Sequence, residues 1–451
     1  MSKPSIPIVS VSTSELDEFL QAQPDHTRAW LSSQNFKGKS GSLCLVPGDD
    51  GGLARVVCGV GDSRGIWSAG HVAAKIPKGS YHLDADWDDP PTALMALGFL
   101  LDCYRFNRYR SKPAEAPTLE LPESHRHELS ALADAVGLCR DLVNTPTENL
   151  GPPELGQAVA ALGEEFGAEV SEIVGDDLIE QSFPAVHAVG RASAQAPRLI
   201  SLQWGSESDP CIALVGKGVC FDSGGLNIKP ANGMRLMKKD MGGAAHAMGV
   251  ARLVMASGLP VRLLLLVPAV ENAISGNAYR PGDVIPTRKG KSVEIGNTDA
   301  EGRVILSDAL TYAEEQHPEL IVDFATLTGA ARVAMGTDIP PFWSTCDTLA
   351  RDLAAASDSA EDPLWRLPLH PPYRDLLKSD IADINNMAST GFGGAITAAL
   401  FLREFVDDTP WCHIDTFAWN TSRRPGRPKG GDALGLRAVF EMLRVRYGGG
   451  G

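Results

Sequence analysis

Hydrophobic and polar positions along the chain predict an alternation of strands and helices. Short apolar runs bounded by glycine or polar residues predict strands near 198–204, 211–216, 260–268, 319–325 and 412–417. Helices are expected near 153–166, 242–257, 302–316, 396–406 and 434–447. Because strands and helices alternate, we expect βαβ units and a mostly parallel central sheet flanked by helices.

The N-terminal third has its own pattern. A strand-like run at Leu53–Val60 and an apolar helix near 92–109 predict a smaller α/β domain. The polar, proline-rich stretch at 111–124 is the best linker candidate, and apolar positions with a period of 3.6 predict a helix at 126–143. Since 451 residues are more than a single hydrophobic core usually holds, we expect two domains. The expected division is an N-terminal α/β domain at 1–120, a linker and connecting helix at 121–145, and a larger α/β domain at 146–451.

Composition is that of a soluble globular protein. Hydrophobic residues make up 43% of the chain, and no apolar stretch approaches the ~20 residues that cross a bilayer. The first ten residues lack the apolar core of a secretory signal, so we expect a cytoplasmic location. A net charge of −15 argues against general nucleic-acid binding. Eight scattered cysteines predict buried thiols, and the lack of a His-Glu-x-x-His motif argues against a histidine-ligated zinc site.

Candidate chemistry begins with the heptapeptide Asn-Thr-Asp-Ala-Glu-Gly-Arg at 297–303. Asp299, Glu301 and Arg303 alternate with small residues, so an extended backbone would point all three the same way. Two carboxylates beside a guanidinium suggest either a metal site or a solvated salt-bridge cluster. Taken alone, the heptapeptide favours the salt-bridge cluster.

A second segment upstream carries four more charged candidates, which are Lys217, Asp222, Lys229 and Asp240. The apolar run Cys211–Val215 predicts a buried strand, which places Lys217 and Asp222 at and just beyond its C-terminal end. Ligands bind at that edge in open α/β sheets.

Together the two segments resemble the leucine (cytosol) aminopeptidase family. The resemblance includes the heptapeptide, the series Gly-Lys-Gly, Phe-Asp-Ser-Gly-Gly, Lys and Asp-Met-Gly-Gly with its spacings, the Ala325–Gly329 segment, and His413-Ile-Asp415 with the later Gly-Arg-Pro-Lys-Gly-Gly. It covers the C-terminal two thirds densely and the N-terminal third loosely. It implies a metalloaminopeptidase that releases N-terminal amino acids from peptides, and it makes 146–451 the catalytic metallopeptidase domain.

The resemblance also implies a site without histidine for two divalent metal ions, typically Zn²⁺, with Mn²⁺ or Mg²⁺ also used. Asp222, Asp299 and Glu301 would hold one ion. Lys217 and Asp240, with Asp222 and Glu301 as bridging ligands, would hold the other. Four carboxylates would offset the charge of both ions. Lys217 can act as a ligand only as a neutral amine.

The remaining roles are likewise implied by the family. Lys229 would stabilise the oxyanion on the substrate carbonyl, and Arg303 would hold a bicarbonate that acts as general base. Met237, Thr326 and Gly329 would line the pocket for the first side chain. An apolar wall there would favour leucine-like residues, but one methylene changes binding by only ~1–3 kcal/mol, so we expect broad specificity.

Other interpretations stay open from the residues themselves. Two-metal carboxylate sites also hydrolyse phosphoesters, and a scaffold protein can keep a fold without turnover. The residues before Asp240 are Lys238 and Lys239, which add positive charge where the family often has a smaller residue. By resemblance, the assembly would be a homohexamer built as a pair of trimers.

Overall fold

The computed structural model describes residues 5–449, which form two compact units. The first unit contains the residues up to Gly137 together with Asn420–Gly430, and the second contains Leu138–Trp419 and the residues from Gly431 onward. Residues 420–430 therefore pack with the first unit, although they lie near the end of the chain. The boundaries expected at residues 120 and 145 stay a prediction.

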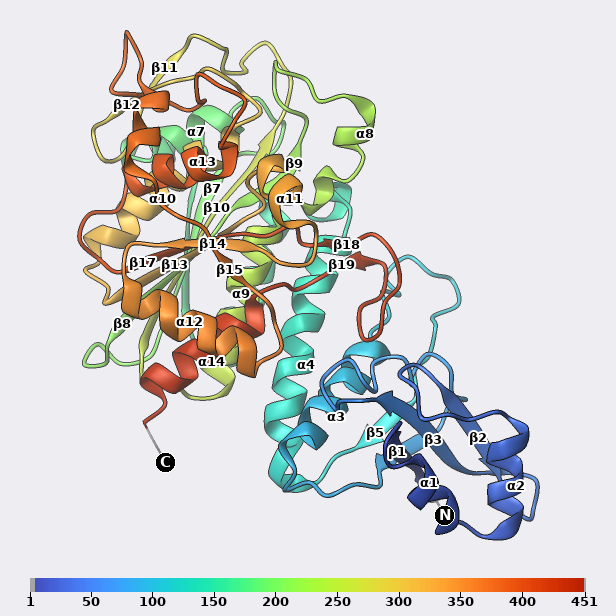
Figure 1. Cartoon of the computed structure of the whole chain (residues 1–451). Helices are drawn as coiled ribbons and strands as arrows, with labels where there is room; N and C mark the ends of the chain where they lie inside the picture. The colour runs from blue at the N-terminus through green and yellow to red at the C-terminus, as the bar shows by residue number, and fades with distance from the viewer. Residues whose placement is uncertain (1–4, 450–451) are drawn as a thin grey trace. The chain divides into compact units, whose positions relative to one another are not determined.

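The first unit is built on a five-stranded sheet in the order β2-β3-β1-β4-β5 (Figure 1). Of its strand pairs, only β2 with β3 is antiparallel. Val11, Leu31 and Val57 belong to its buried apolar core. Its elements are β1 (Ile6–Ser12), α1 (Leu16–Gln21), α2 (Asp25–Ser33), β2 (Leu43–Pro47), β3 (Leu53–Gly61), β4 (Ser80–Leu83), α3 (Pro90–Cys103) and β5 (Thr118–Glu120).

The helix expected at 92–109 ends earlier than predicted, at Cys103. Arg105 donates hydrogen bonds to the carbonyl oxygens of Asp102 and Tyr104, and these bonds satisfy acceptors that the end of a helix leaves open. A side-chain cap of this kind gives no apolar signal, so periodicity alone overestimates the length of the helix.

The second unit is built on a larger sheet in the order β15-β14-β17-β13-β8-β10-β7-β6, with β9 also paired to β10 (Figure 1). The central neighbours β10, β8, β13 and β17 are parallel, whereas β6, β7 and β14 join antiparallel. The predicted α/β class and mostly parallel central sheet are confirmed. The strands are β6 (Glu169–Val174), β7 (Arg198–Trp204), β8 (Cys211–Gly216), β9 (Gly218–Asp222), β10 (Arg262–Asn272), β13 (Leu320–Ala325), β14 (Pro341–Ser344), β15 (Trp365–Arg366) and β17 (Trp411–Asp415).

Helices cover both faces of this sheet, which is why β8 and β13 are buried along their whole length. On one face α9 packs against β8 and β13, with α14 behind it. On the other, Ala213 and Val215 share a core with α7 and α10. The main helices are α4 (Glu123–Asn144), α5 (Pro152–Phe166), α7 (Pro184–Gly190), α9 (Gly242–Ala256), α10 (Glu301–Glu315), α12 (Asp347–Ser359), α13 (Gly394–Arg403) and α14 (Leu436–Tyr447).

Shorter elements connect these layers. They are α6 (Asp177–Glu180), α8 (Ala231–Met234), β11 (Val284–Pro286), β12 (Ser292–Glu294), α11 (Gly329–Met335), β16 (Ile384–Asn385), β18 (Trp419–Asn420) and β19 (Gly430–Gly431), with 3₁₀ turns at Thr147–Asn149, Met237–Lys239 and Pro371–Leu377. β11, β12 and β16 form a small separate sheet.

The strand expected at 260–268 continues further, to Asn272. Its first half pairs with β8 and its second half with β9, so β10 has a parallel partner along almost its whole length. The extension brings Asn272 opposite Asp222, where the candidate site lies.

Two expectations from composition also agree with the structure. All eight cysteines are free, and most are buried, as scattered reduced thiols should be. In the part of the chain that the structure describes, no helix combines the length and the apolarity that a bilayer crossing needs.

Candidate metal centre and substrate pocket

The predicted charged residues come together at the C-terminal edge of the large sheet. Lys217 lies between β8 and β9, and Asp222 is the last residue of β9. Glu301 opens α10, with Asp299 two residues before it. Asp240 follows the 3₁₀ turn that precedes α9. Strand ends and helix starts thus place all five residues at the edge where α/β sheets bind ligands.

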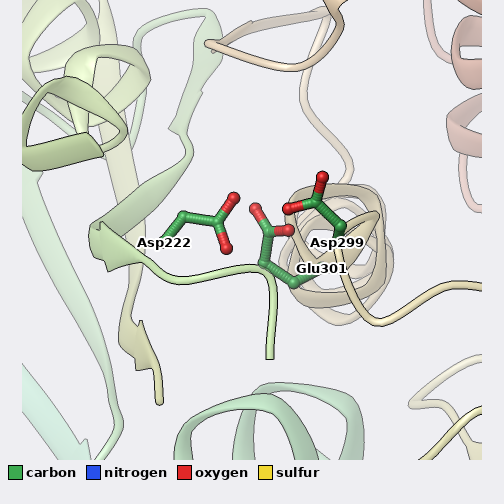
Figure 2. Close-up of side chains that lie close together, drawn as sticks. All are labelled: Asp222, Asp299 and Glu301. Atoms are coloured by element: carbon green, nitrogen blue, oxygen red, sulfur yellow. The ribbon is translucent and has the colours of Figure 1, made fainter. Parts of the chain in front are cut away.

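Three carboxylates form the centre of the site. Asp222, Asp299 and Glu301 each offer an oxygen atom, and these atoms lie within 4.8 Å of one another. Figure 2 shows the three carboxylates turned toward one another. Asp222 and Glu301 are buried, and Glu301 Oε2 accepts no hydrogen bond from any residue that the structure describes. Like charges at this separation repel, so nearby positive charge stabilises the cluster.

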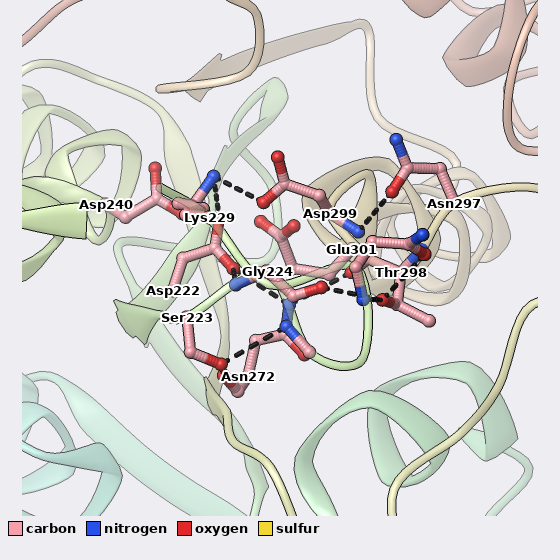
Figure 3. A network of polar contacts seen from close by, with 12 residues as sticks. Asp222, Ser223, Gly224, Lys229, Asp240, Asn272, Asn297, Thr298, Asp299 and Glu301 are labelled. Carbon is pink, nitrogen blue, oxygen red and sulfur yellow. Dashed lines mark hydrogen bonds and ion pairs between the residues drawn. The ribbon is translucent and has the colours of Figure 1, made fainter. Parts of the chain in front are cut away.

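Two lysines supply positive charge between the carboxylates. Lys217 Nζ lies 2.8 Å from Asp240 Oδ2 and 2.9 Å from Glu301 Oε1. Lys229 Nζ lies 2.7 Å from Asp222 Oδ2 and also pairs with Asp299, as Figure 3 shows. Each ammonium group therefore bridges two carboxylates.

The pKa values reflect a site with more negative than positive charge. Burial acts to lower the pKa of Lys217, but the nearby carboxylates of Asp240 and Glu301 outweigh it, and the net pKa is raised. Burial, with the charge of Asp240, raises the pKa of Asp222 to about 6. Burial, with the charge of Asp222, raises the pKa of Glu301 to about 8. Additional cations would relieve this excess of negative charge.

A polar network that the sequence did not reveal joins the two ligand segments (Figure 3). Asn272 Nδ2 donates to Asp222 Oδ1 (2.8 Å) and to the carbonyl oxygen of Thr298 (3.0 Å). The hydroxyl of Thr298 donates to the carbonyl of Gly224, a residue whose φ of 88° favours glycine. Asn272 is a lone asparagine at the end of an apolar strand, so no motif marks it.

Asn386 holds the heptapeptide from the other side. Its Oδ1 accepts the N–H groups of Gly296 (2.9 Å) and Asn297 (3.2 Å), and its Nδ2 donates to the carbonyl of Asn297 (2.8 Å). Its own carbonyl oxygen accepts a hydrogen bond from Arg303 Nη1 at 2.8 Å. This residue was also missed from the sequence.

The structure does not have the extended backbone that would point Asp299, Glu301 and Arg303 the same way, and the helix expected at 302–316 begins one residue earlier. α10 begins at Glu301, so Glu301 and Arg303 are two residues apart on a helix and point in different directions. The apolar spacing that follows Gly302 favours the helix, and it overrides the local alternation of small and charged residues. Arg303 is buried, and burial lowers its pKa to about 10.

A cavity of about 240 Å³ adjoins the carboxylates. Every predicted site residue except Arg303 lines it, including Met237, Thr326 and Gly329. Lys239 and Arg332 also line the cavity, although neither was predicted as a site residue. The pocket wall is therefore less apolar than the sequence suggested.

Asp415 fixes the loop that forms part of this wall. Its Oδ1 accepts the N–H of Leu327 at 2.9 Å, and its Oδ2 accepts the N–H (3.0 Å) and the hydroxyl (2.7 Å) of Thr328. The His413-Ile-Asp415 segment was noted in the sequence, but its function there is the positioning of the neighbouring loop.

Comparison with known proteins agrees with this arrangement. Residues 137–440 match the catalytic domain of the cytosol aminopeptidase family, and residues 6–122 match the M17 aminopeptidase N-terminal domain. A probable cytosol aminopeptidase of Roseiflexus castenholzii is 41% identical over 79% of this chain and 77% of that protein. One from Rhodopseudomonas palustris (CGA009) is 38% identical over 93% of this chain and 90% of that protein.

Solved structures extend the likeness to the whole chain. The crystal structure of a cytosol aminopeptidase from Coxiella burnetii is 50% identical, with a TM-score of 0.96 over 99% of this chain and 98% of that one. The bottromycin maturation enzyme BotP in complex with Mn is 34% identical, with a TM-score of 0.89 over 98% of this chain and 100% of that one. This chain belongs to the cytosol aminopeptidase family.

Proposed function

We propose that this protein releases N-terminal amino acids from peptides with the help of two divalent metal ions bound at the carboxylate cluster. Membership of the cytosol aminopeptidase family makes it a metal-dependent aminopeptidase. The observation that carries the proposed site is the convergence of oxygen atoms from Asp222, Asp299 and Glu301 within 4.8 Å. Because the structural relative BotP was solved with Mn, manganese is one candidate ion, with zinc and magnesium as the others.

The donor set fits divalent ions. Asp222, Asp299 and Glu301 would hold one ion, and Asp222 and Glu301 would be shared with a second ion held by Lys217 and Asp240. The buried Glu301 Oε2 atom, which has no hydrogen-bond donor, supports this assignment. When bound, such ions lower the pKa of a bound water and polarise the scissile carbonyl. Lys217 must lose its proton to become a ligand.

Of the two lysines that pair with the carboxylate cluster, Lys229 is the better placed to contact a substrate. Its side chain is 15% exposed, whereas that of Lys217 is 3% exposed. Lys229 also lines the cavity, and its pKa is raised because the carboxylates of Asp222 and Glu301 outweigh the effect of burial. A permanently protonated amine at this point would donate to the substrate carbonyl oxygen as negative charge develops there.

Arg303 would hold a bicarbonate ion. Its Nη1 donates to Asn386, but its buried Nε has no acceptor within residues 5–449, and a guanidinium with a free donor suits a planar oxyanion. A base held by Arg303 would take the proton of the attacking water.

The substrate's first side chain would occupy the cavity lined by Met237, Thr326 and Gly329. The size of the cavity allows more than one kind of side chain, so we retain broad specificity.

Assembly and location rest on resemblance. We propose a homohexamer made of two trimers in the cytoplasm, as the name cytosol aminopeptidase of the relatives suggests for the location. Light scattering of the purified protein at physiological salt tests the assembly, and a monomer peak would contradict it.

Hydrolysis of leucine p-nitroanilide tests the proposed function. The protein is stripped with a chelator and then reloaded separately with Zn²⁺ and Mn²⁺, and the bound metal is counted. We expect activity to be lost on stripping and restored by metal. A phosphodiester substrate is assayed in parallel, because two-metal sites also cleave phosphoesters. Turnover of the phosphodiester alone would favour that class, and binding of a peptide without turnover would favour a scaffold.

A further inference from the structure

One side of the substrate cavity is positively charged. Lys239, from the 3₁₀ turn before Asp240, and Arg332, from α11, both line the cavity. Both side chains lie over the ring of Phe417, with Lys239 Nζ 5.1 Å and Arg332 Cζ 4.7 Å from the ring centroid. A shared aromatic ring holds cations in place without neutralising them.

Neither cation has a close carboxylate partner. Among residues 5–449, the guanidinium of Arg332 forms no ion pair, and Lys239 Nζ comes no closer than 4.0 Å to its one partner, Asp240 Oδ1. That oxygen already accepts a hydrogen bond from Thr326 at 2.8 Å. Both carboxylate oxygens of Asp415, which also lines the cavity, accept hydrogen bonds from the loop at 327–328. The cavity therefore contains positive charge on Lys239 and Arg332 that Asp240 and Asp415 do not neutralise.

The charge lies where the first side chain of the substrate is proposed to bind. A Cβ atom at Gly329 would lie 3.5 Å from Arg332 Nη2, so the guanidinium lies against the glycine of the proposed pocket. Met237 and Thr326 line the same cavity. An anionic group in this cavity would meet Arg332 without displacing another ligand.

We propose that Arg332 and Lys239 are specificity-determining residues, and that the pocket selects peptides whose N-terminal residue is aspartate or glutamate. This inference rests on the proposed aminopeptidase function and names its substrate class. The side-chain carboxylate of the substrate would form charge-assisted hydrogen bonds with the guanidinium, with Lys239 adding attraction from the inner wall. A C-terminal carboxylate of a short peptide has the same chemistry, but it projects from the other side of the scissile bond.

The test compares glutamyl and glutaminyl p-nitroanilides, which have nearly the same shape and differ in charge. Neither carries a C-terminal carboxylate, so a difference reports the first side chain. We expect the metal-loaded protein to show a kcat/KM about tenfold higher for Glu than for Gln, because hydrogen bonds to charged groups are the stronger ones. Arg332→Gln should lower this ratio, with Lys239 preserving a small part of the preference, and Arg332→Glu should turn the preference toward lysyl p-nitroanilide. Arg351→Gln, an exposed arginine outside the cavity, is the matched control and should keep the wild-type ratio.

The outcomes separate this inference from the proposed function. Cleavage of leucine p-nitroanilide with equal rates for Glu and Gln would overturn the inference and leave the aminopeptidase intact. An equal loss of Glu and Gln turnover in Arg332→Gln would also overturn it, because a structural role would lower both. A third outcome is a tenfold preference for Leu-Gly over its C-terminal amide that is lost in Arg332→Gln, with no preference for Glu over Gln. This outcome would overturn the inference and show that the two cations bind the C-terminal carboxylate of the peptide. If no substrate is hydrolysed, both this inference and the proposed aminopeptidase function are overturned.

Discussion

The carbonyl oxygen of Asn386 accepts a hydrogen bond from Arg303 Nη1 at 2.8 Å, and this bond ties the buried guanidinium to the loop that holds the heptapeptide. The side chain of Asn386 in turn bonds the backbone of Gly296 and Asn297. One buried asparagine thus positions both the approach to Asp299 and the guanidinium proposed to hold the base. Its two functions can be separated, because the carbonyl survives replacement of the side chain.

Asn386→Ala should weaken the loop while keeping the bond to Arg303. The partly buried N–H groups of Gly296 and Asn297 would lose their acceptor, which should cost about 1 kcal/mol of unfolding free energy. Displacement of Asp299 should lower metal affinity as well. Urea unfolding and metal titration check both effects. Asn277→Ala, an exposed asparagine with a long hydrogen bond of 3.5 Å, is the control and should change neither quantity. An unchanged metal affinity in Asn386→Ala would contradict the positioning role.

Lys217→Met should destabilise the metal-free protein more than the metal-loaded protein. Without the ammonium group, Asp240 and Glu301 face each other buried and uncompensated, which costs about 3–5 kcal/mol. Metal ions would supply part of the missing charge, so metal should restore part of the stability although not the activity. Chemical unfolding with chelator and with added Zn²⁺ measures this difference. Lys78→Met, which removes an exposed ion pair with Glu115, should cost less than about 1 kcal/mol in both states. An equal loss for Lys217→Met in both states would argue against metal at this position.

The convergence of the charged candidate residues was predictable because their spacing in the chain is specific, and because strand ends in an α/β sheet meet at one edge. Asn272 and Asn386 were not predictable. Their partners are backbone groups 26 and 89 residues away, and any asparagine can bond a backbone group that the fold brings near it. The fold, and no local pattern, determines which asparagine does so.

Two local patterns disagree within the heptapeptide, and the helix expected at 302–316 is the one that the structure contains. Alternation of small and charged residues indicates an extended chain, but α10 begins inside the heptapeptide. A helix start here directs the side chain of Glu301 toward Asp222 and Asp299, while Arg303 is turned away to Asn386. The sequence therefore predicted which carboxylates lie together but not the direction of Arg303, because residue identity and backbone conformation are separate predictions.

Metal binding should release protons and strengthen with pH. The pKa of Lys217 is raised by Asp240 and Glu301, which outweigh burial, so its amine is protonated in the metal-free protein at neutral pH. Since only the neutral amine binds a metal, binding must release this proton, and affinity should rise about tenfold per pH unit for each proton released. Calorimetry in two buffers with different ionisation enthalpies measures the number of protons. Lys217→Met should release fewer, and equal release by both proteins would refute Lys217 as a ligand.

In the first unit, the Glu15–Arg64 ion pair should make stability depend on pH. Arg64 donates to both carboxylate oxygens of Glu15, at 3.0 and 2.6 Å, and these hydrogen bonds lower the pKa of Glu15 from 4.5 to about 2. Because the folded pKa is the lower one, the contribution is present above pH 4.5 and is lost as pH falls toward 2. Glu15 is partly exposed, so the effect should not exceed about 1 kcal/mol. Urea unfolding should show that Glu15→Gln has a lower free energy of unfolding than wild type at pH 6, and that this difference narrows by pH 3. Glu18→Gln, which changes an exposed neighbour, should have the same free energy of unfolding as wild type at both pH values.

Lys229→Met should lower kcat far more than it changes metal content. Lys229 pairs with Asp222 and Asp299, yet it is more exposed than Lys217 and lines the cavity, so its proposed partner during turnover is the substrate carbonyl oxygen. Loss of one oxyanion donor costs about 10²–10³ in kcat. Asp299→Asn should instead lower both activity and bound metal. Steady-state kinetics and metal analysis of the same preparations distinguish the two variants. A parallel loss of metal and kcat in Lys229→Met would make Lys229 a structural counter-ion rather than a residue that acts on the substrate.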